Sequence, residues 1–266
     1  MRIAFIGAGT MAEAMVAGII KKGVTTADRI ITSDPVSDRL DYMVKTYGVG
    51  VTSSNSEAIH AADLIVFAVK PQNLDSVLAG LKGAIEKRQL VLSIVAGATI
   101  ARIAGILQHD TVVRVMPNTP AQVGQGMSVW TSTPSVDAQQ REATRSILQG
   151  LGKEIYFEDE KYIDMATAVS GSGPAYVFLI QEAFTDAAVH IGLSRKVAEE
   201  LVNQTLIGSL VFAQQSEKHP AELRNLVTSP GGTTAEALRQ FEHAGIRSAF
   251  TEAVIAAYDK AKQLGG

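Results

Sequence analysis

The sequence predicts an α/β N-terminal domain with a doubly wound sheet, followed by an all-α C-terminal domain. Through about residue 130, short apolar runs rich in β-branched residues alternate with longer stretches of helical spacing. From Tyr162 to Gln263 only helical patterns occur. A length of 266 residues also fits two domains of ordinary size. We place the domains at residues 1–158 and 159–266.

The first domain carries five apolar runs that predict strands. Continuous apolar strands separated by helices are typical of a parallel sheet covered on both faces, and right-handed crossovers wind such a sheet in both directions. We expect a turn at Thr131–Pro134. The expected strands are Ile3–Ile6, Arg29–Thr32, Leu64–Val69, Leu90–Val95 and Val112–Met116, and the expected helices include Met11–Lys22, Asp38–Tyr47 and Asp137–Leu151.

A helix over Ala175–Ile191 dominates the second domain, with Pro174 at a position that the first turn of a helix tolerates. Apolar residues lie on more than one face of this helix, which indicates burial on several sides. About a hundred mostly helical residues are few to enclose it. We therefore expect a second subunit to cover the helix, while an ordinary core helix packed within its own chain is the alternative.

Composition excludes several function classes. Lys plus Arg number 24 against 27 Asp plus Glu, so a basic surface for nucleic acid or an anionic membrane is not expected. The absence of cysteine excludes disulfides, thiolate nucleophiles and iron–sulfur clusters. The five histidines show no paired spacing, so we expect no metal. With neither a run of about 18 apolar residues nor a secretory signal, we expect a cytoplasmic protein.

A glycine-rich turn joins the first strand to the first helix. Gly7-Ala8-Gly9-Thr10-Met11-Ala12 matches G-x-G-x-x-A in the context that a Rossmann-type dinucleotide site requires. The first glycine allows the tight turn, the second admits a pyrophosphate, and the helix N-terminus attracts the anion. A glycine turn without a ligand is the weaker alternative. The residues expected to contact the cofactor here are Ile6, Gly7, Ala8, Gly9, Thr10 and Met11.

Asp34 follows the second strand, where an acidic residue binds the adenosine ribose and disfavours a 2′-phosphate. Ser33, Arg29 and Arg39 could nevertheless serve a phosphate, so the cofactor is NADPH or NADH. A turn cap before Pro35 is a strong alternative role for Asp34.

Other predicted cofactor contacts follow later strands, because ligands of open α/β sheets bind at the carboxyl ends of strands. Asn55 could also be a helix N-cap, and Asn118 could be a purely structural turn residue between two prolines. The residues in this group are Asn55, Ala68, Val69, Lys70, Pro71, Ala96, Gly97 and Asn118.

A second glycine turn, Thr228-Ser229-Pro230-Gly231-Gly232-Thr233-Thr234, runs into a helical segment. Backbone N–H groups at such a helix start could bind a carboxylate. The alternative is an ordinary helix start, with Thr233 and Glu236 forming a capping box.

The motifs G-A-G-T-M-A at the N-terminus, A-V-K-P at 68–71, V-M-P-N-T-P at 115–120, S-G-S-G-P-A-Y at 170–176 and T-S-P-G-G-T-T at 228–234 together resemble those of pyrroline-5-carboxylate reductases. The resemblance implies reduction of 1-pyrroline-5-carboxylate to L-proline by NAD(P)H, the last step of proline biosynthesis. It also implies a helical domain that interlocks with a partner subunit, in a homodimer or a larger ring of dimers. It assigns substrate contacts to Ser229, Gly231, Gly232, Thr233, Thr234, Glu160 and Glu217, with the Thr234 hydroxyl acting in catalysis at the ring nitrogen.

Two other functions fit parts of the sequence. A 3-hydroxyacid or 6-phosphogluconate-type dehydrogenase shares the first glycine turn and a helical second domain. Such enzymes place a catalytic lysine on the helix after a glycine-rich stretch, whereas this chain has no lysine from Pro174 to Arg195. A non-catalytic dinucleotide sensor would keep Gly7 and Gly9 but would have no need for the turn at 231–234.

Overall fold

The computed structural model describes residues 1–265. Contacts between residues divide the chain into two compact units. One unit contains Met1–Ser172 together with the chain from Ala257 onward, and the other contains Gly173–Ala256. The functional boundary after residue 158 stays a prediction.

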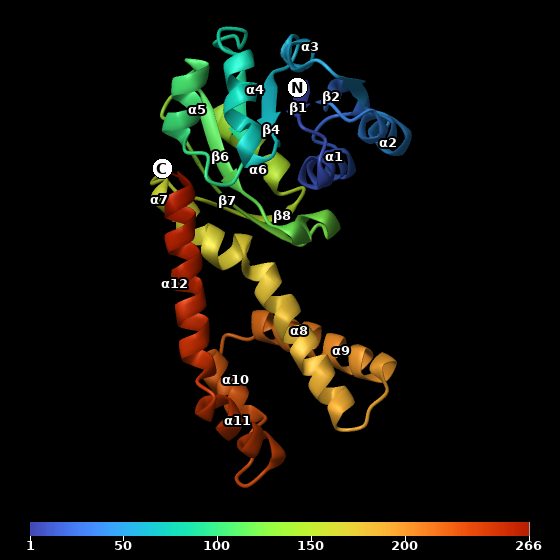
Figure 1. Cartoon of the computed structure of the whole chain (residues 1–266), viewed down its shortest axis with the longest axis vertical. Coiled ribbons are helices and arrows are strands. Elements are labelled where there is room, and N and C mark those ends of the chain that lie inside the picture. The colour runs from blue at the N-terminus through green and yellow to red at the C-terminus, as the bar shows by residue number, and fades with distance from the viewer. Residues whose placement is uncertain (266) are drawn as a thin grey trace. The chain divides into compact units, whose positions relative to one another are not determined.

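Within the described residues, the first unit contains one eight-stranded sheet in the order β3-β2-β1-β4-β5-β6-β7-β8 (Figure 1). The five predicted strands are present, with ends shifted by at most two residues. The strands are β1 (Ile3–Ile6), β2 (Ile30–Ser33), β3 (Gly50–Thr52), β4 (Leu64–Phe67), β5 (Leu90–Ser93), β6 (Val112–Met116), β7 (Gly126–Ser132) and β8 (Gly152–Tyr156).

The sheet is mixed, so the prediction of a parallel sheet is wrong for its last strands. β7 pairs antiparallel with β6, and β8 pairs parallel with β7. The connection from Met116 to Gly126 is too short for the crossover that a parallel neighbour requires. The turn predicted at Thr131–Pro134 begins two residues later, because Thr131 and Ser132 belong to β7 and are buried. The Val136 N–H donates to the Thr133 carbonyl oxygen at 3.2 Å and closes the turn.

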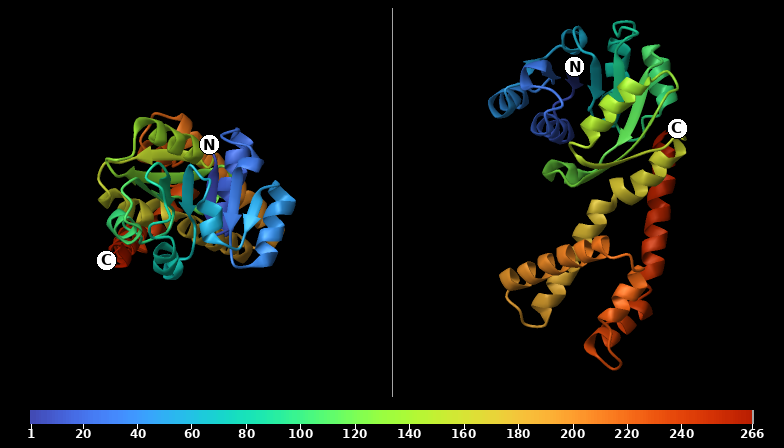
Figure 2. Two further views of the ribbon diagram at one scale, coloured as in Figure 1. Left: turned by 90° about the horizontal axis from the view of Figure 1, so that it is seen from above. Right: turned by 180° about the vertical axis from the view of Figure 1, so that it is seen from behind.

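Helices cover both faces of the sheet because successive strand residues point to opposite sides. Ile3 and Phe5 of β1 pack in one core with α1 (Thr10–Lys22), α2 (Ser37–Tyr47) and α6 (Ala138–Leu148). Ala4 and Ile6 pack in the other core with α3 (Asn55–Ile59), α4 (Leu74–Gly80) and α5 (Ile100–Leu107). Accordingly, α4 and α5 lie in front of the sheet in Figure 1. In the right-hand view of Figure 2, which is seen from the opposite side, α6 lies in front of the sheet.

Short helical turns complete the first unit: η1 (Ala27–Arg29), η2 (Pro71–Asn73) and η3 (Thr119–Val123). α7 (Lys161–Ala166) continues into a π-helical turn, η4 (Thr167–Gly171). The buried Arg114 of β6 ties α7 to the sheet, since its guanidinium pairs with Glu160 and Asp164 at 2.8 Å each.

The second unit is helical throughout, as predicted. It contains α8 (Gly173–His190), with Pro174 in its first turn, α9 (Arg195–Gln215), α10 (Pro220–Leu226), α11 (Thr233–His243) and the beginning of α12 (Ile246–Gly265). α8 packs against α9, yet only Thr185 and Ala188 of α8 are buried. Phe178 is 60% exposed and Leu179 65% exposed, so α8 presents an apolar surface that this chain leaves uncovered.

The helical stretch Lys161–His190 is long and apolar enough, by length and composition alone, to cross a membrane. This differs from the expectation that no stretch reaches that threshold. The stretch includes the exposed apolar residues of α8, which a protein partner would equally cover.

Candidate active site

The residues predicted to bind the cofactor lie along one edge of the sheet. Ile6 pairs in register with Ser33 on one side and with Phe67 on the other, and Phe67 pairs with Ser93. The carboxyl ends of β1, β2, β4 and β5 are therefore level. This alignment brings together the first glycine turn, Asp34, Ala68–Pro71 and the loop that contains Ala96 and Gly97.

The first glycine turn has the geometry that a dinucleotide requires. Gly7 has φ +100°, and a Cβ there would lie 2.7 Å from the Ala68 carbonyl oxygen. A Cβ at Gly9, the N-cap of α1, would meet no atom within 4 Å and would project into open space. No side chain caps α1 among the described residues. Its first N–H groups therefore fit the pyrophosphate of a nicotinamide dinucleotide.

The Asp34 side chain stabilises both the first glycine turn and the turn in which Asp34 itself lies. One carboxylate oxygen accepts a hydrogen bond from the Ala8 N–H at 2.9 Å, and the other accepts one from the Val36 N–H at 3.0 Å. Asn55 is not a helix N-cap, since Ser54 caps α3 through the Glu57 N–H. Instead, the Ser33 hydroxyl donates to the Asn55 side-chain oxygen at 2.7 Å.

Arg39 reaches the glycine turn, whereas Arg29 does not. Arg29 precedes β2 and lines a pocket with Arg2 and Ile3, at the amino ends of the strands. It is therefore excluded as a phosphate ligand at the carboxyl edge. The Arg39 guanidinium donates to the Ala8 carbonyl oxygen and pairs with Glu13.

Two tyrosines also hold Glu13, because the hydroxyls of Tyr42 and Tyr47 donate to one of its oxygens at 3.0 and 2.9 Å. Burial alone would raise the pKa of Glu13, but hydrogen bonds from Arg39 and the tyrosines outweigh it and leave the pKa below its ordinary value. Burial and the Glu13 carboxylate raise the pKa of Tyr47 to about 12. Sequence reasoning missed this cluster, although the spacing from Arg39 to Tyr42 on one helix was visible.

Two predicted cofactor residues have structural roles. Gly97 has φ +72°, and a Cβ there would lie 2.8 Å from the Leu264 carbonyl oxygen. The close approach of the end of α12 therefore requires glycine at position 97. The Asn118 side chain donates to the Ser170 carbonyl at 3.0 Å and accepts from the Met127 N–H at 2.8 Å. These bonds favour the structural interpretation of Asn118. Lys70, by contrast, is exposed at the start of η2.

The second glycine turn begins α11. Gly232 is the N-cap and Thr233 the first helical residue, without a side-chain cap among the described residues. The alternative interpretation, a capping box of Thr233 and Glu236, is therefore wrong: the Glu236 side chain pairs with Arg239 instead. Gly231 has φ +68°, which the turn requires, and the Gly232 N–H donates to the Ser229 carbonyl at 3.1 Å.

The two predicted substrate glutamates lie in different units. Glu217 is exposed in the loop between α9 and α10, in the unit that contains α11. Glu160 belongs to the first unit, where its carboxylate accepts from Arg114 and from the Ile100 N–H, both at 2.8 Å. The carboxylate of Glu160 is thus already engaged with the sheet and with the start of α5.

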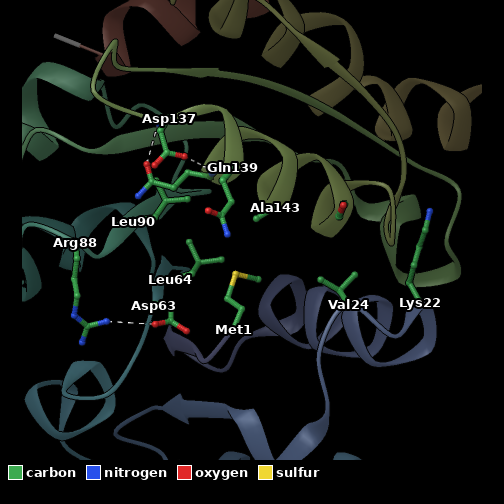
Figure 3. Close-up of a pocket in the computed structure, with 12 residues that line it drawn as sticks. Met1, Lys22, Val24, Asp63, Leu64, Arg88, Leu90, Asp137, Gln139 and Ala143 are labelled. Carbon is green, nitrogen blue, oxygen red and sulfur yellow. Dashed lines mark hydrogen bonds and ion pairs between the residues drawn. The ribbon is translucent and has the colours of Figure 1, made fainter.

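A pocket of about 840 Å³ lies at the opposite edge of the sheet (Figure 3). Met1, Leu64 and Leu90 mark the amino ends of β1, β4 and β5 in its lining. Two of its charged groups pair with each other, Arg88 with Asp63 at 3.3 Å, and Asp137 caps α6. The pocket contains none of the predicted site residues. Nor do the described residues bring three acidic or histidine side chains together as metal ligands.

A doubly wound sheet with a G-x-G-x-x-A turn at its carboxyl edge, joined to a helical unit with an exposed apolar surface, defines a nicotinamide-dinucleotide oxidoreductase with a helical C-terminal domain. Family models agree with both parts. Residues 160–264 match pyrroline-5-carboxylate reductase dimerisation, and residues 2–97 match NADP oxidoreductase coenzyme F420-dependent.

The chain belongs to the pyrroline-5-carboxylate reductase family. It is 41% identical to a pyrroline-5-carboxylate reductase of Synechocystis sp., over 100% of this chain and 98% of the relative. It is 42% identical to one of Pseudomonas aeruginosa, over 99% and 96%. A Plasmodium falciparum pyrroline carboxylate reductase structure with NADP bound has a TM-score of 0.92 and 33% identity, covering 100% of this chain and 98% of that one.

Proposed function

We propose that this chain reduces 1-pyrroline-5-carboxylate to L-proline with NADPH or NADH, as the last step of proline biosynthesis. The observation that carries the proposal is the full-length match to reductases of this name, which includes both glycine turns. The test is steady-state kinetics with 1-pyrroline-5-carboxylate and each reduced nucleotide. A 3-hydroxy acid with the oxidised nucleotides serves as the comparison substrate. Nucleotide binding without turnover of either substrate would favour a sensor.

The carboxyl edge of the sheet is the proposed cofactor site. When bound there, the dinucleotide supplies the hydride. The turn from Ile6 to Met11 would hold its pyrophosphate, Asp34 and Asn55 its adenosine ribose, and the segments Ala68–Pro71 and Ala96–Gly97 the remainder. Asn118 would support this site indirectly, because its side-chain amide donates a hydrogen bond to the Ser170 carbonyl oxygen.

The start of α11 is the proposed substrate site. The N–H groups of Gly231 and Thr233 and the Ser229 hydroxyl suit the substrate carboxylate. Gly232, whose N–H donates to the Ser229 carbonyl, would contribute to the substrate site by closing the turn. The Thr234 hydroxyl, in the first turn of the helix, would donate to the ring nitrogen. Because a protonated imine is already electrophilic, the site needs chiefly to hold it in place. Glu217 would favour the cationic form, whereas a substrate role for Glu160 would compete with Arg114.

Replacing Asp34 by serine is expected to shift the cofactor preference toward NADPH by about tenfold, because a carboxylate repels a 2′-phosphate. The measurement is the ratio of kcat/KM for NADPH to that for NADH. Since Asp34 also accepts from Ala8 and Val36, the variant's melting temperature should be recorded beside it. An unchanged ratio would show that Asp34 stabilises the turn but does not determine the cofactor preference.

The match to a dimerisation domain indicates a homo-oligomer, and the exposed apolar face of α8 is the proposed contact surface. Replacing Leu179, 65% exposed, by glutamate should convert the oligomer to monomers in sedimentation velocity at micromolar concentration. Val123→Glu is the matched control, since Val123 is 75% exposed in the first unit. Wild-type protein that sediments as a monomer would contradict the proposal. A species larger than a dimer would support a ring of dimers.

We place the enzyme in the cytoplasm, without nucleic acid or a membrane as partner. The lack of cysteine suits a reducing compartment, and the net charge of −3 gives neither polyanion nor anionic lipid an electrostatic advantage.

A further inference from the structure

The side chains around Ala8 form a small charged cluster beside the proposed adenosine site. Asp34 binds the Ala8 N–H, and Arg39 binds the carbonyl oxygen of the same residue. The carboxylate and the guanidinium therefore lie on two sides of one residue. Arg39 pairs with Glu13, and the described residues show no ion pair between Arg39 and Asp34.

Glu13 is fixed in place by this cluster. It lies in the first turn of α1, next to the helix N-terminus proposed to hold the pyrophosphate. Arg39 pairs with one of its oxygens, and the hydroxyls of Tyr42 and Tyr47 donate to the other at 3.0 and 2.9 Å. The lowered pKa of Glu13 keeps the carboxylate charged at neutral pH.

Arg39 is the cation in a position to meet a 2′-phosphate. Its guanidinium lies 4.8 Å from the centre of the Tyr42 ring and keeps 26% of its side chain exposed. In dinucleotide-binding folds an arginine near the end of the second strand accommodates the 2′-phosphate. Here Glu13 offsets that charge, so the two carboxylates leave the cluster with an excess negative charge beside the place where a dianionic phosphate would bind.

We infer that Glu13 is a specificity-determining residue, which lowers the affinity for the 2′-phosphorylated dinucleotide by offsetting the charge of Arg39. This inference rests on the proposed placement of the adenosine at Asp34. Neutralising Glu13 leaves Arg39 uncompensated and makes the local potential more positive by one charge. Both dinucleotides share the pyrophosphate, so the gain that distinguishes NADP⁺ from NAD⁺ is the gain at the 2′-phosphate.

The test is calorimetric titration of the whole protein with NADP⁺ and with NAD⁺. Glu13→Gln should lower the Kd for NADP⁺ relative to the Kd for NAD⁺ by roughly threefold or more at low salt. The gain should shrink as salt is raised, because the groups are partly exposed to solvent. Adenosine 2′,5′-bisphosphate against adenosine 5′-monophosphate should show the same difference without the nicotinamide half.

Glu142→Gln is the matched control, since Glu142 pairs with Arg145 on α6 and contacts no predicted cofactor residue. Arg39→Gln should act in the opposite direction and weaken NADP⁺ relative to NAD⁺. The inference is overturned if Glu13→Gln leaves the ratio of the two Kd values unchanged or lowers the relative affinity for NADP⁺. Wild-type protein that binds neither nucleotide would instead overturn the proposed cofactor site.

Discussion

Thr234→Ala is expected to lower kcat on the order of a hundredfold, the lower end of what a positioned proton-donating group contributes. Thr234 is the second residue of α11, half-buried, and its backbone N–H remains in the variant. Only the hydroxyl proposed to meet the ring nitrogen is lost. The measurement is steady-state reduction of 1-pyrroline-5-carboxylate at saturating nucleotide. A variant with wild-type kcat would remove Thr234 from the mechanism.

The neighbouring Thr233 provides the comparison. Thr233 is exposed and its proposed contact is the backbone N–H, which alanine retains. Thr233→Ala should therefore change kcat by less than about threefold, well below the effect of a lost catalytic donor. Neither variant should alter the Kd for the nucleotide, because the proposed cofactor residues lie in the other unit. Equal losses in both variants would point to a disturbed helix start rather than to a lost hydroxyl.

Strands were predictable where burial on both faces makes the sequence apolar or nearly so. Ile3–Ile6 and Val112–Met116 were located to the residue. β3, β7 and β8 were not predicted, because their sequences do not form such apolar runs. β3 has three residues and begins at Gly50, and β8, at the sheet edge, alternates exposed and half-buried residues, including Lys153. A short edge strand needs little apolar surface, so its composition resembles that of a loop.

That the proposed cofactor residues follow the carboxyl ends of strands was predictable for a similar reason, since a glycine turn after a strand and the ends of parallel strands are local features. The hydrogen-bond partners of those residues could not be predicted from the sequence. Asp34 with Ala8, and Asn118 with Ser170, are contacts between segments far apart in the sequence. Nothing in the residues around Asn118 indicates that a carbonyl more than fifty positions away will occupy its amide.

The distant contacts of Arg114, by contrast, could have been predicted from the sequence. It interrupts an otherwise apolar strand, β6, and a buried guanidinium requires counter-charges. The structure supplies Glu160 and Asp164 from α7, both at 2.8 Å, and Arg114 itself is 3% exposed. The substrate role that resemblance assigned to Glu160 therefore has to be weighed against its place in this triad.

Arg114→Met is accordingly expected to lower the free energy of unfolding by about 3 kcal/mol, since removing one partner of a buried pair leaves uncompensated charge. The side chains of Glu160 and Asp164 are 31% and 18% exposed, and water reaching them keeps the loss near the lower end of the usual range. Urea unfolding at several protein concentrations separates this loss from subunit dissociation.

The triple variant Arg114→Met, Glu160→Gln, Asp164→Asn distinguishes charge from packing. It removes every charge of the triad while keeping the side-chain volumes similar, so most of the lost stability should return, as it does when whole buried ion pairs are replaced. The Glu160 amide oxygen would still accept from the Ile100 N–H and hold the start of α5. If the single variant were as stable as wild type, the triad would not hold α7 to the sheet. If instead the triple variant stayed as unstable as the single one, the guanidinium would act through its packing against β6 and not through its charge.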